Sequence, residues 1–524
     1  MICSASIHVP LTPGSASHLY ISHQDFYPAG VANMYRSTVF IAVIPLLLSA
    51  CQGSSQHHSD TQSESEFSGI WTSIAYGETI EVRDHSVSLY QHSSDYCISA
   101  GEQDVSDQAL IQDGWQIFDS AGETHLRQFQ TLLGTQTFSP EYTLQSSLPE
   151  SCQHNLLNAH DSNALDLFDF FVQTYAELYP SFTQRQVNWD AHAADVRQTL
   201  TTGSDGDELI PALAELIEPL QDSHLSINIG DDSISFSRNN TLLLQLISEF
   251  IDSEGEVTNE QQYQALLTYL DEQITRVKNN RLNYAAGDIE SRGNNLVQWY
   301  LSDNNTGVLI IDGMLGFDSP AANTSTNTNT NTNNEERSEI ADLQTIAAIM
   351  DEAITALQDS NGLVIDIRLN GGGYDSVSQL ISRYFLDSSR SLYQKQARLG
   401  SGRTEPDTIT LQPASRTYLK PITLLTSANT VSAAEVFTLI MRELPQVTLM
   451  GSETQGALAD VLDRTLTDDI SFTLVNEYYL TMDGDWFEGS GIPAEIATQS
   501  FTLAQRNDHR DDTLAAALDS LFDN

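Results

Sequence analysis

The 524-residue chain is predicted to be an α/β protein whose core follows a small β-domain and a helical domain. Three patterns predict this order. Residues 67–152 alternate apolar and polar side chains in short stretches, residues from about 163 repeat apolar side chains at helical spacing, and residues 296–500 alternate apolar runs with helical stretches. Buried strands that alternate with helices are typical of a parallel sheet covered by helices.

The β-domain is placed at residues 67–155 and the helical domain at 160–290. In the first, Thr79–Val82 and Ser86–Tyr90 have strand periodicity and are separated by turn-forming residues. In the second, the spacing of apolar residues predicts amphipathic helices, for example at 209–220. No Gly-Leu-Gly-Phe-like loop precedes a strand there, which argues against any but a degenerate PDZ module.

The predicted core, residues 296–500, contains apolar runs that indicate buried strands, together with stretches of helical spacing. The strands are 307–311, 362–367, 421–425 and 447–450, and the helices are 340–357 and 432–443. An Asn-Thr repeat at 323–334 is interpreted as a surface insertion, because its polar side chains have no packing of their own. Residues 501–524 are expected to form a C-terminal helix or tail.

The charge of the chain limits its partners. Acidic residues outnumber basic ones by 71 to 23, which gives a formal net charge of −48. Nucleic acids and anionic membrane surfaces should therefore repel the protein. The acidic residues are spread along the chain, which favours a solvating surface over an acidic recognition site. The four cysteines have no CxxC spacing and no neighbouring histidines, so we predict no structural metal and no cofactor.

The N-terminal region carries an export pattern. The apolar stretch 39–48 follows Met34-Tyr35-Arg36 and ends in Ser49-Ala50-Cys51. This order resembles a bacterial lipoprotein signal peptide with its lipobox. We therefore expect a lipid on Cys51, the true start at Met34, and an upstream segment at 1–33. A transmembrane helix is the alternative, but about ten apolar residues fall short of the ~20 that a span needs.

Export has two consequences. Gln52 follows the cysteine at the position where an Asp would retain a lipoprotein in the inner membrane. The lipoprotein resemblance therefore implies a lipid anchor in the outer membrane, facing the periplasm or the surface. Residues 51–66 are expected to form a flexible tether. Once Cys3 is discarded with the upstream segment and Cys51 is lipidated, Cys97 and Cys152 are the two thiols left in an oxidising compartment. We expect them to form a disulfide, and two buried free thiols are the alternative.

Two passages of the core carry candidate catalytic residues. A buried strand runs into Gly371-Gly372-Gly373, where backbone N–H groups can approach a ligand because no Cβ intervenes. Ser432 ends a strand and opens a helix, at whose N-terminus free N–H groups stabilise negative charge. The amides of Ala433 and the glycine turn would supply the two donors that an oxyanion needs. Taken alone, Ser432 and Glu435 are also a capping box, in which the serine is structural.

With these passages the sequence resembles the C-terminal processing, or tail-specific, peptidases and their tricorn-core relatives. The resemblance covers about 160–500 and is densest in Leu363–Gly373, Pro421–Thr454 and Glu488–Ile496. It implies the crotonase-like αββ core of that family. It also implies that Ser432, three residues before a helix glutamate, is the nucleophile, and that the oxyanion hole is formed by Gly372, Gly373 and Ala433.

One departure from the family selects the branch. In the bacterial processing enzymes a lysine base follows the turn glycine, but here Gly456 is followed by Ala457, and the lysines beyond His224 are Lys278, Lys395 and Lys420. A different base is required. His224 lies between a helix and a strand in a segment that resembles the family's Asp-x-His motif, so the resemblance implies a histidine base. A hydrogen-bonded core histidine is the alternative.

The tricorn branch also uses a serine beside the histidine as a relay. A glutamate in the family's closing motif, which Glu488–Ile496 resembles, orients that relay. These roles map onto Ser223 and Glu488. A turn serine is the alternative for Ser223, and the acidic competitors of Glu488 are Glu477, Asp483 and Asp485. We interpret Asp366 and Arg368 as a buried structural pair.

The favoured hypothesis is a serine peptidase that cleaves exported proteins or peptides through an acyl-enzyme. One alternative is a catalytically inactive lipoprotein of the same fold that binds peptides or apolar ligands. Another is a lipoprotein that acts through interactions of its β-domain. Ser432, His224 and the three glycines together favour the enzyme, because a binding protein has no need of all of them.

Overall fold

The computed structural model describes most of the chain downstream of the predicted tether and two short segments near the N-terminus. The described residues are 5–10, 18–22, 65–84, 86–158, 162–230, 232–238, 241–318 and 339–522. Met34, Cys51 and the Asn-Thr repeat at 323–334 lie outside the described residues. Within those ranges, no helix is both long and apolar enough to cross a membrane.

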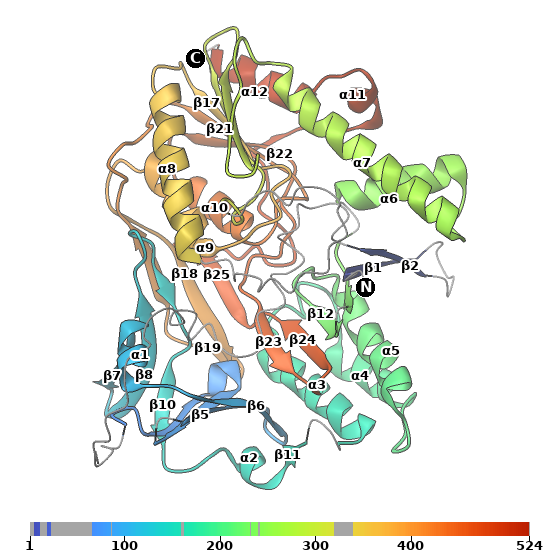
Figure 1. Ribbon diagram of the computed structural model, residues 1–524, viewed down its shortest axis with the longest axis vertical. Helices are drawn as coiled ribbons and strands as arrows, with labels where there is room; N and C mark the ends of the chain where they lie inside the picture. The colour runs from blue at the N-terminus through green and yellow to red at the C-terminus, as the bar shows by residue number, and fades with distance from the viewer. Residues whose placement is uncertain are drawn as a thin grey trace, which may run out of the picture.

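A seven-stranded sheet forms the centre of the core, with the strand order β14-β15-β16-β17-β21-β22-β26 (Figure 1). Its members are β14 (Glu290–Arg292), β15 (Val297–Leu301), β16 (Gly307–Ile311), β17 (Leu363–Asp366), β21 (Ile422–Thr426), β22 (Val447–Gly451) and β26 (Ile496–Ala497). The strands from β16 to β26 run parallel to one another. β15 is antiparallel to both of its neighbours, β14 and β16. The four apolar runs singled out in the sequence are thus adjacent strands of one sheet.

Helices cover both faces of this sheet, which explains why its strands are apolar throughout. On one face lie α8 (Glu339–Leu357), α9 (Asp375–Ser382), which continues into η5 (Arg383–Phe385), and α10 (Ala433–Met441). On the other face, Leu514 and Ala517 of α12 (Asp512–Phe522) pack against Val364 and Leu425. The short helix α11 (Leu503–Asn507) precedes α12. The core is therefore α/β, as predicted.

The N-terminal β-structure is an antiparallel sheet in the order β11-β6-β5-β4-β3-β10-β8-β7, with β9 paired to β8. Its elements are β3 (Gly69–Ser73), η3 (Ile74–Tyr76), β4 (Glu78–Arg83), β5 (Ser86–His92), β6 (Cys97–Asp104), α1 (Asp107–Gln112), β7 (Trp115–Ser120), β8 (Glu123–Gln130), β9 (Thr137–Phe138), β10 (Tyr142–Gln145), α2 (Glu150–His154) and β11 (Leu156–Leu157). Only the short β11 joins its neighbour in parallel. The stretches Thr79–Val82 and Ser86–Tyr90 lie in β4 and β5, as predicted.

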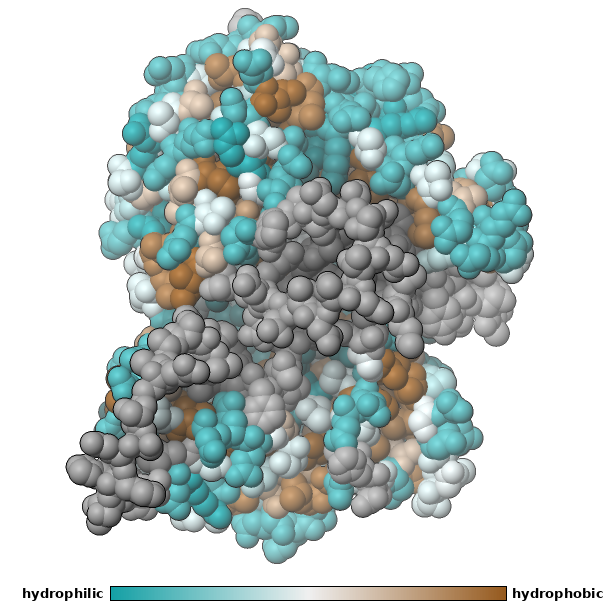
Figure 2. All heavy atoms as spheres, viewed as in Figure 1, coloured by the Kyte–Doolittle hydropathy of each residue, from teal (hydrophilic) through white to brown (hydrophobic). Residues whose placement is uncertain are grey.

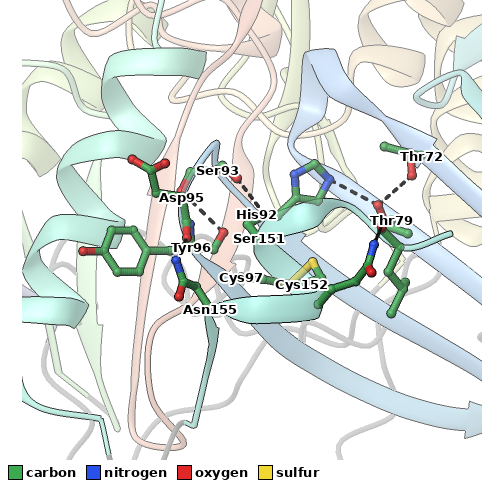
Figure 3. Close-up of a disulfide and its surroundings, with 12 residues drawn as sticks. Thr72, Thr79, His92, Ser93, Asp95, Tyr96, Cys97, Ser151, Cys152 and Asn155 are labelled. Atoms are coloured by element: carbon green, nitrogen blue, oxygen red, sulfur yellow. Dashed lines mark hydrogen bonds between the residues drawn. A yellow bond between two sulfur atoms is a disulfide. The ribbon is translucent and has the colours of Figure 1, made fainter.

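A disulfide joins Cys97, at the start of β6, to Cys152 in α2, which confirms the predicted pairing (Figure 3). Both cysteines are buried. Beside the bond, the Ser151 hydroxyl donates to the Ser93 carbonyl at 3.0 Å, and the Asn155 amide donates to the Asp95 carbonyl at 2.8 Å. Helix α2 is thus fixed covalently and by hydrogen bonds to the turn between β5 and β6.

The helical region contains α3 (Ala164–Leu178), α4 (Trp189–Arg197), α5 (Gly206–Ile217), η4 (Glu218–Leu220), α6 (Leu242–Glu254) and α7 (Glu260–Leu282). The strands β12 (Ser226–Ile229) and β13 (Asp232–Ser235) follow η4 and join a sheet in the order β2-β1-β13-β12-β24-β23. In the described residues 241–282 the fold is a helix pair, which does not fit a PDZ module.

That sheet includes two strands in the region that we expected to lie upstream of the true start. They are β1 (Ala5–Pro10) and β2 (His18–Ser22), and β1 pairs in parallel with β13. No element is expected there from the sequence. The alternation of Ile7 and Val9 with polar neighbours is the strand signal that it missed. The remaining strands of the sheet are β23 (Leu462–Thr465) and β24 (Ile470–Leu474).

A fourth sheet connects the core with the N-terminal β-structure. It consists of β18 (Arg390–Leu399), β19 (Gly402–Arg403), β20 (Asp407–Leu411) and β25 (Glu477–Thr481). Figure 1 shows β18 and β25 running from α9 toward the N-terminal strands. Polar contacts hold this junction, among them Tyr76 with Glu477 and Arg127 with Asp407, and a further contact joins Arg464 of β23 to Glu78 of the N-terminal sheet at 2.9 Å.

The surface fits the acidic composition. In Figure 2 hydrophilic residues cover most of the described atoms on this face, and hydrophobic residues form separate small groups. Single exposed apolar residues are normal on a globular protein. This face of the described structure therefore offers no large apolar patch.

Candidate active site

Ser432 lies between β21 and α10 in an uncommon backbone conformation. Its φ and ψ angles are 58° and −129°, a region that residues other than glycine rarely adopt. Its backbone N–H donates to the Ala457 carbonyl at 2.9 Å and to Glu435 Oε2 at 3.3 Å. Strained backbone of this kind persists only where the surroundings hold it, and it is concentrated at functional sites.

The glycine turn lies directly against Ser432. A Cβ on Gly372 would stand 2.7 Å from Ser432 Cβ, and a Cβ on Gly373 would stand 2.4 Å from the carbonyl carbon of Met314. Both glycines have positive φ angles, 102° and 145°. Neither position can hold a larger residue without displacing its neighbours, which explains the glycines at this strand end.

The candidate oxyanion donors differ in their availability. The Gly372 N–H already donates to Asn370 Oδ1 at 2.9 Å, so its amide is engaged. In the described part of the chain, the N–H groups of Gly373 and Ala433 have no acceptor. Of the residues named from the sequence, Gly373 and Ala433 thus retain free donors, each next in sequence to one of the two residues, Gly372 and Ser432, that approach each other closely. Two convergent N–H groups are what a tetrahedral oxyanion requires.

His224 lies in the turn between η4 and β12, as the sequence predicted. It is 2% exposed. Its backbone N–H donates to Asp222 Oδ1 at 3.1 Å, and its carbonyl accepts from Thr473 Oγ1 at 2.7 Å. Burial lowers the pKa of the imidazole below its ordinary value, although the charges of Asp222 and Asp460 oppose this. The ring is therefore neutral at pH 7, the state in which it accepts a proton.

Ser432 and His224 both lie along the segment Gly456–Asp460. The Ser432 N–H is bonded to the carbonyl of Ala457, and the backbone of Ala459 and the charge of Asp460 act on the imidazole of His224. The described residues offer no hydrogen-bond partner to His224 Nδ1. The fold thus places both residues along one five-residue segment, and the described residues show no hydrogen bond between the Ser432 and His224 side chains.

Glu488 is the acidic residue of the closing motif that contacts this segment. It is buried, and its Oε2 accepts the N–H groups of Leu458 and Ala459 at 3.0 and 3.2 Å. Burial, and then the charge of Asp222, raise its pKa to about 8, against the opposing charge of Arg185. Its three competitors lie elsewhere, because Glu477 pairs with a lysine of β18 and the other two are exposed, at Asp483 and Asp485.

Ser223 precedes His224, and its hydroxyl is buried with no hydrogen-bond partner among the described residues. A buried hydroxyl without a partner is costly, and such groups are often found where a ligand or water binds. The structure thus leaves Ser223 Oγ available. It shows no hydrogen bond between the described Ser223 and Glu488 side chains.

The structure shows whether a lysine could act as the base. Ala457 is buried and carries no amine, and Lys395 Nζ lies 3.0 Å from both Asp460 Oδ2 and Glu477 Oε2. Burial alone would lower the pKa of Lys395, but the charges of Asp460, Glu477 and Asp375 raise it well above its usual value. The neighbouring carboxylates thus favour the protonated form of Lys395, which is not the form that accepts a proton.

Sequence reasoning missed an ionic cluster next to His224. Arg185 Nη2 lies 3.0 Å from Asp222 Oδ2 and donates to the Gly456 carbonyl at 3.0 Å, while Tyr179 donates to Asp222 at 2.8 Å. All three side chains are buried. The sequence did offer one signal for this cluster. Arg185 follows closely after Tyr179 and Phe182, and the chain has few basic residues.

The expected structural pair is also present. Arg368 Nη2 lies 2.6 Å from Asp366 Oδ2 and 2.7 Å from Asp511 Oδ2, and all three side chains are buried. This confirms the interpretation of Asp366 and Arg368 and adds a third member from the C-terminal region.

Among the described residues, no group of three or more histidine, cysteine or acidic side chains is arranged to hold a metal ion.

Comparisons with known proteins point to one family. Residues 336–498 match Peptidase family S41. The chain is 26% identical over 158 residues to the carboxy-terminal processing protease CtpA of Bacillus subtilis, a match that covers 30% of this chain and 33% of CtpA. It is 31% identical over 136 residues to the tricorn protease of Thermoplasma volcanium, covering 26% of this chain and 12% of that protein. The matches thus span a third or less of the length of these relatives.

The fold is also similar to a solved structure. A crystal structure of a candidate peptidase from Parabacteroides merdae superposes with a TM-score of 0.52 at 22% identity, and the match covers 69% of this chain and 97% of the other. At this level of identity the likeness concerns the fold alone.

Proposed function

Because residues 336–498 form a domain of peptidase family S41, we propose that the protein is a serine peptidase that cleaves exported proteins or peptides, with Ser432 as nucleophile and His224 as general base. One observation carries the proposal. Ser432, in a strained conformation, precedes the free amide of Ala433, lies against the glycine turn that carries the free Gly373 amide, and contacts the same segment, 456–460, as a neutral, buried histidine.

In the proposed reaction Ser432 Oγ attacks the carbonyl carbon of the scissile peptide bond, and its proton passes to His224. The oxyanion is stabilised by the Gly373 and Ala433 N–H groups. When the C–N bond breaks, protonated His224 gives its proton to the leaving amine. Water, deprotonated by His224, then attacks the acyl-enzyme; when the bond between the acyl carbon and Ser432 Oγ breaks, His224 returns the proton to Ser432 Oγ and the acid is released.

Ser223 and Glu488 are proposed as relay and orienting residue for His224. Ser223 supports this because its hydroxyl is buried, unpaired and adjacent in sequence to the base. Glu488 supports it because its carboxylate is buried and holds the amides of Leu458 and Ala459, next to the imidazole.

We also propose that the protein is exported and lipid-anchored to the outer membrane through Cys51. The disulfide between Cys97 and Cys152 supports export, because disulfides form and persist in oxidising compartments.

A fluorophosphonate probe tests the function directly, since it reacts covalently with activated serines. We expect the full-length protein to be labelled at Ser432 and to hydrolyse an unstructured protein substrate such as casein. The Ser432→Ala variant should lose both properties and keep its thermal stability to within about 1 kcal/mol, the worth of a helix cap. A folded wild-type protein that is neither labelled nor active would contradict the peptidase and favour a binding protein of the same fold.

A further inference from the structure

Glu435 makes more contacts than a helix cap requires. Its side chain is completely buried in the first turn of α10. Oε1 accepts hydrogen bonds from Thr454 Oγ1 at 2.6 Å and from the Gly456 N–H at 2.7 Å. Oε2 accepts from the Ala457 N–H at 2.8 Å and from the Ser432 N–H at 3.3 Å. Only the last of these bonds belongs to a capping box.

These four bonds use the hydrogen-bonding capacity of a carboxylate fully. An ionised carboxylate accepts at about four lone-pair positions and donates nothing. All four partners of Glu435 are donors, so a side chain with a hydrogen of its own would face a donor at one oxygen position. Burial raises the pKa of Glu435 to about 7, and the bonds from Thr454, Ala457, Gly456 and Ser432 work against that rise.

The bonds connect the two parts of the candidate site. Glu435 and Glu488 together accept the amides of the four consecutive residues 456–459, two each. The backbone of the same segment also contacts both candidate catalytic residues, because the Ala457 carbonyl accepts the Ser432 N–H and the Ala459 backbone is hydrogen-bonded to the imidazole of His224. The position of this segment therefore sets the position of the serine relative to the histidine.

From this arrangement we propose that Glu435 is a positioning residue of the peptidase reaction. It holds Ser432 in its strained conformation and fixes the segment 456–459 in register with His224. The inference rests on the proposed function, since it concerns the geometry of the same Ser432 and His224. Glu435 itself touches no substrate atom.

The Glu435→Gln variant tests this, because glutamine keeps the shape and places an NH2 group against two donors. We expect kcat, and the rate of fluorophosphonate labelling at Ser432, to fall roughly 10- to 100-fold, as misplacement of a reacting group does. KM should change less than about twofold, because the interaction lost is one that positions the chemistry.

Glu249→Gln is the matched control. Glu249 in α6 also accepts several donors, from Gln245 at 2.9 Å, from Tyr269 at 3.1 Å and from Arg506, but it lies in the separate α6–α7 cluster. Its loss should lower thermal stability and leave kcat and labelling unchanged. Equal kcat losses in both variants would mean that Glu435 acts only through stability, which overturns the proposal.

A second pair of variants keeps the test decisive if Glu435→Gln does not fold. Thr454→Val removes one of the four donors and should lower kcat severalfold, whereas Thr454→Ser keeps the hydroxyl and should restore most of that loss. Unchanged kcat in Thr454→Val, or in a folded Glu435→Gln, overturns the positioning role while Ser432 labelling of the wild type still upholds the peptidase. Absence of labelling in the folded wild type overturns both.

Discussion

The buried pair between Arg368 and Asp511 gives a prediction whose size can be worked out. Asp511 Oδ1 and Oδ2 accept Arg368 Nη1 and Nη2 at 2.9 and 2.7 Å, and Arg368 is completely buried. Asp511→Asn keeps the shape, removes the charge and turns an NH2 group toward the guanidinium. Breaking a buried pair costs about 3–5 kcal/mol. Because Arg368 keeps its contacts with Asp366, we expect about 3 kcal/mol.

The neighbouring residue provides the control. Asp512 pairs with Arg510, and the two side chains are 48% and 44% exposed. Solvent screens an exposed ion pair, so Asp512→Asn should leave stability nearly unchanged. Urea unfolding followed by tryptophan fluorescence measures both, with the m-value as a check on the unfolding reaction. A loss below about 1 kcal/mol for Asp511→Asn, or equal losses for the two variants, would refute the reasoning.

Three further predictions concern the base, the disulfide and the anchor. His224→Ala should reduce kcat/KM about as much as Ser432→Ala, and Ala457→Lys should not improve kcat/KM. The kcat/KM of the wild type should rise with pH through a pKa below 6.5, because burial lowers the pKa of His224 and only the neutral ring accepts the proton. A pH–rate profile rising only above pH 8, or an active His224→Ala variant, would point to another base. Replacing both Cys97 and Cys152 by Ala should cost about 4 kcal/mol in thermal or urea unfolding, since the bond closes a loop of 55 residues; a change under 1 kcal/mol would argue against this estimate. Cys51→Ser should move the protein from the membrane fraction to the soluble periplasmic fraction on cell fractionation, and retention in the membrane would count against the lipobox.

The predictable parts of this fold are those whose cause is local. A strand buried on both faces must be apolar along its length, so β16, β17, β21 and β22 could be located from composition alone. Helix α8 was located from its spacing. The glycine turn and the start of α10 were also readable, because backbone that approaches another segment closely needs glycine and a helix start has its own signals.

The missed parts depend on contacts between distant segments. Glu435 was explained by its neighbour three residues away, but three of its four partners lie in Thr454–Ala457, and nothing in either passage indicates the other. Arg185 was missed for the same reason, since its partners Asp222 and Glu488 come from separate parts of the chain. The Gly372 amide was expected to be free, but it donates to Asn370 Oδ1. That bond forms only in the folded turn, so the sequence gives no sign of it.

The dispersal of the candidate site along the chain also determines when activity can arise. His224 comes from the turn before β12, Ser432 from the start of α10, and Glu488 from the loop between β25 and β26. Contacts between residues so far apart in sequence form late, after the loops between them have closed. A chain that has folded only in part therefore lacks the complete candidate site.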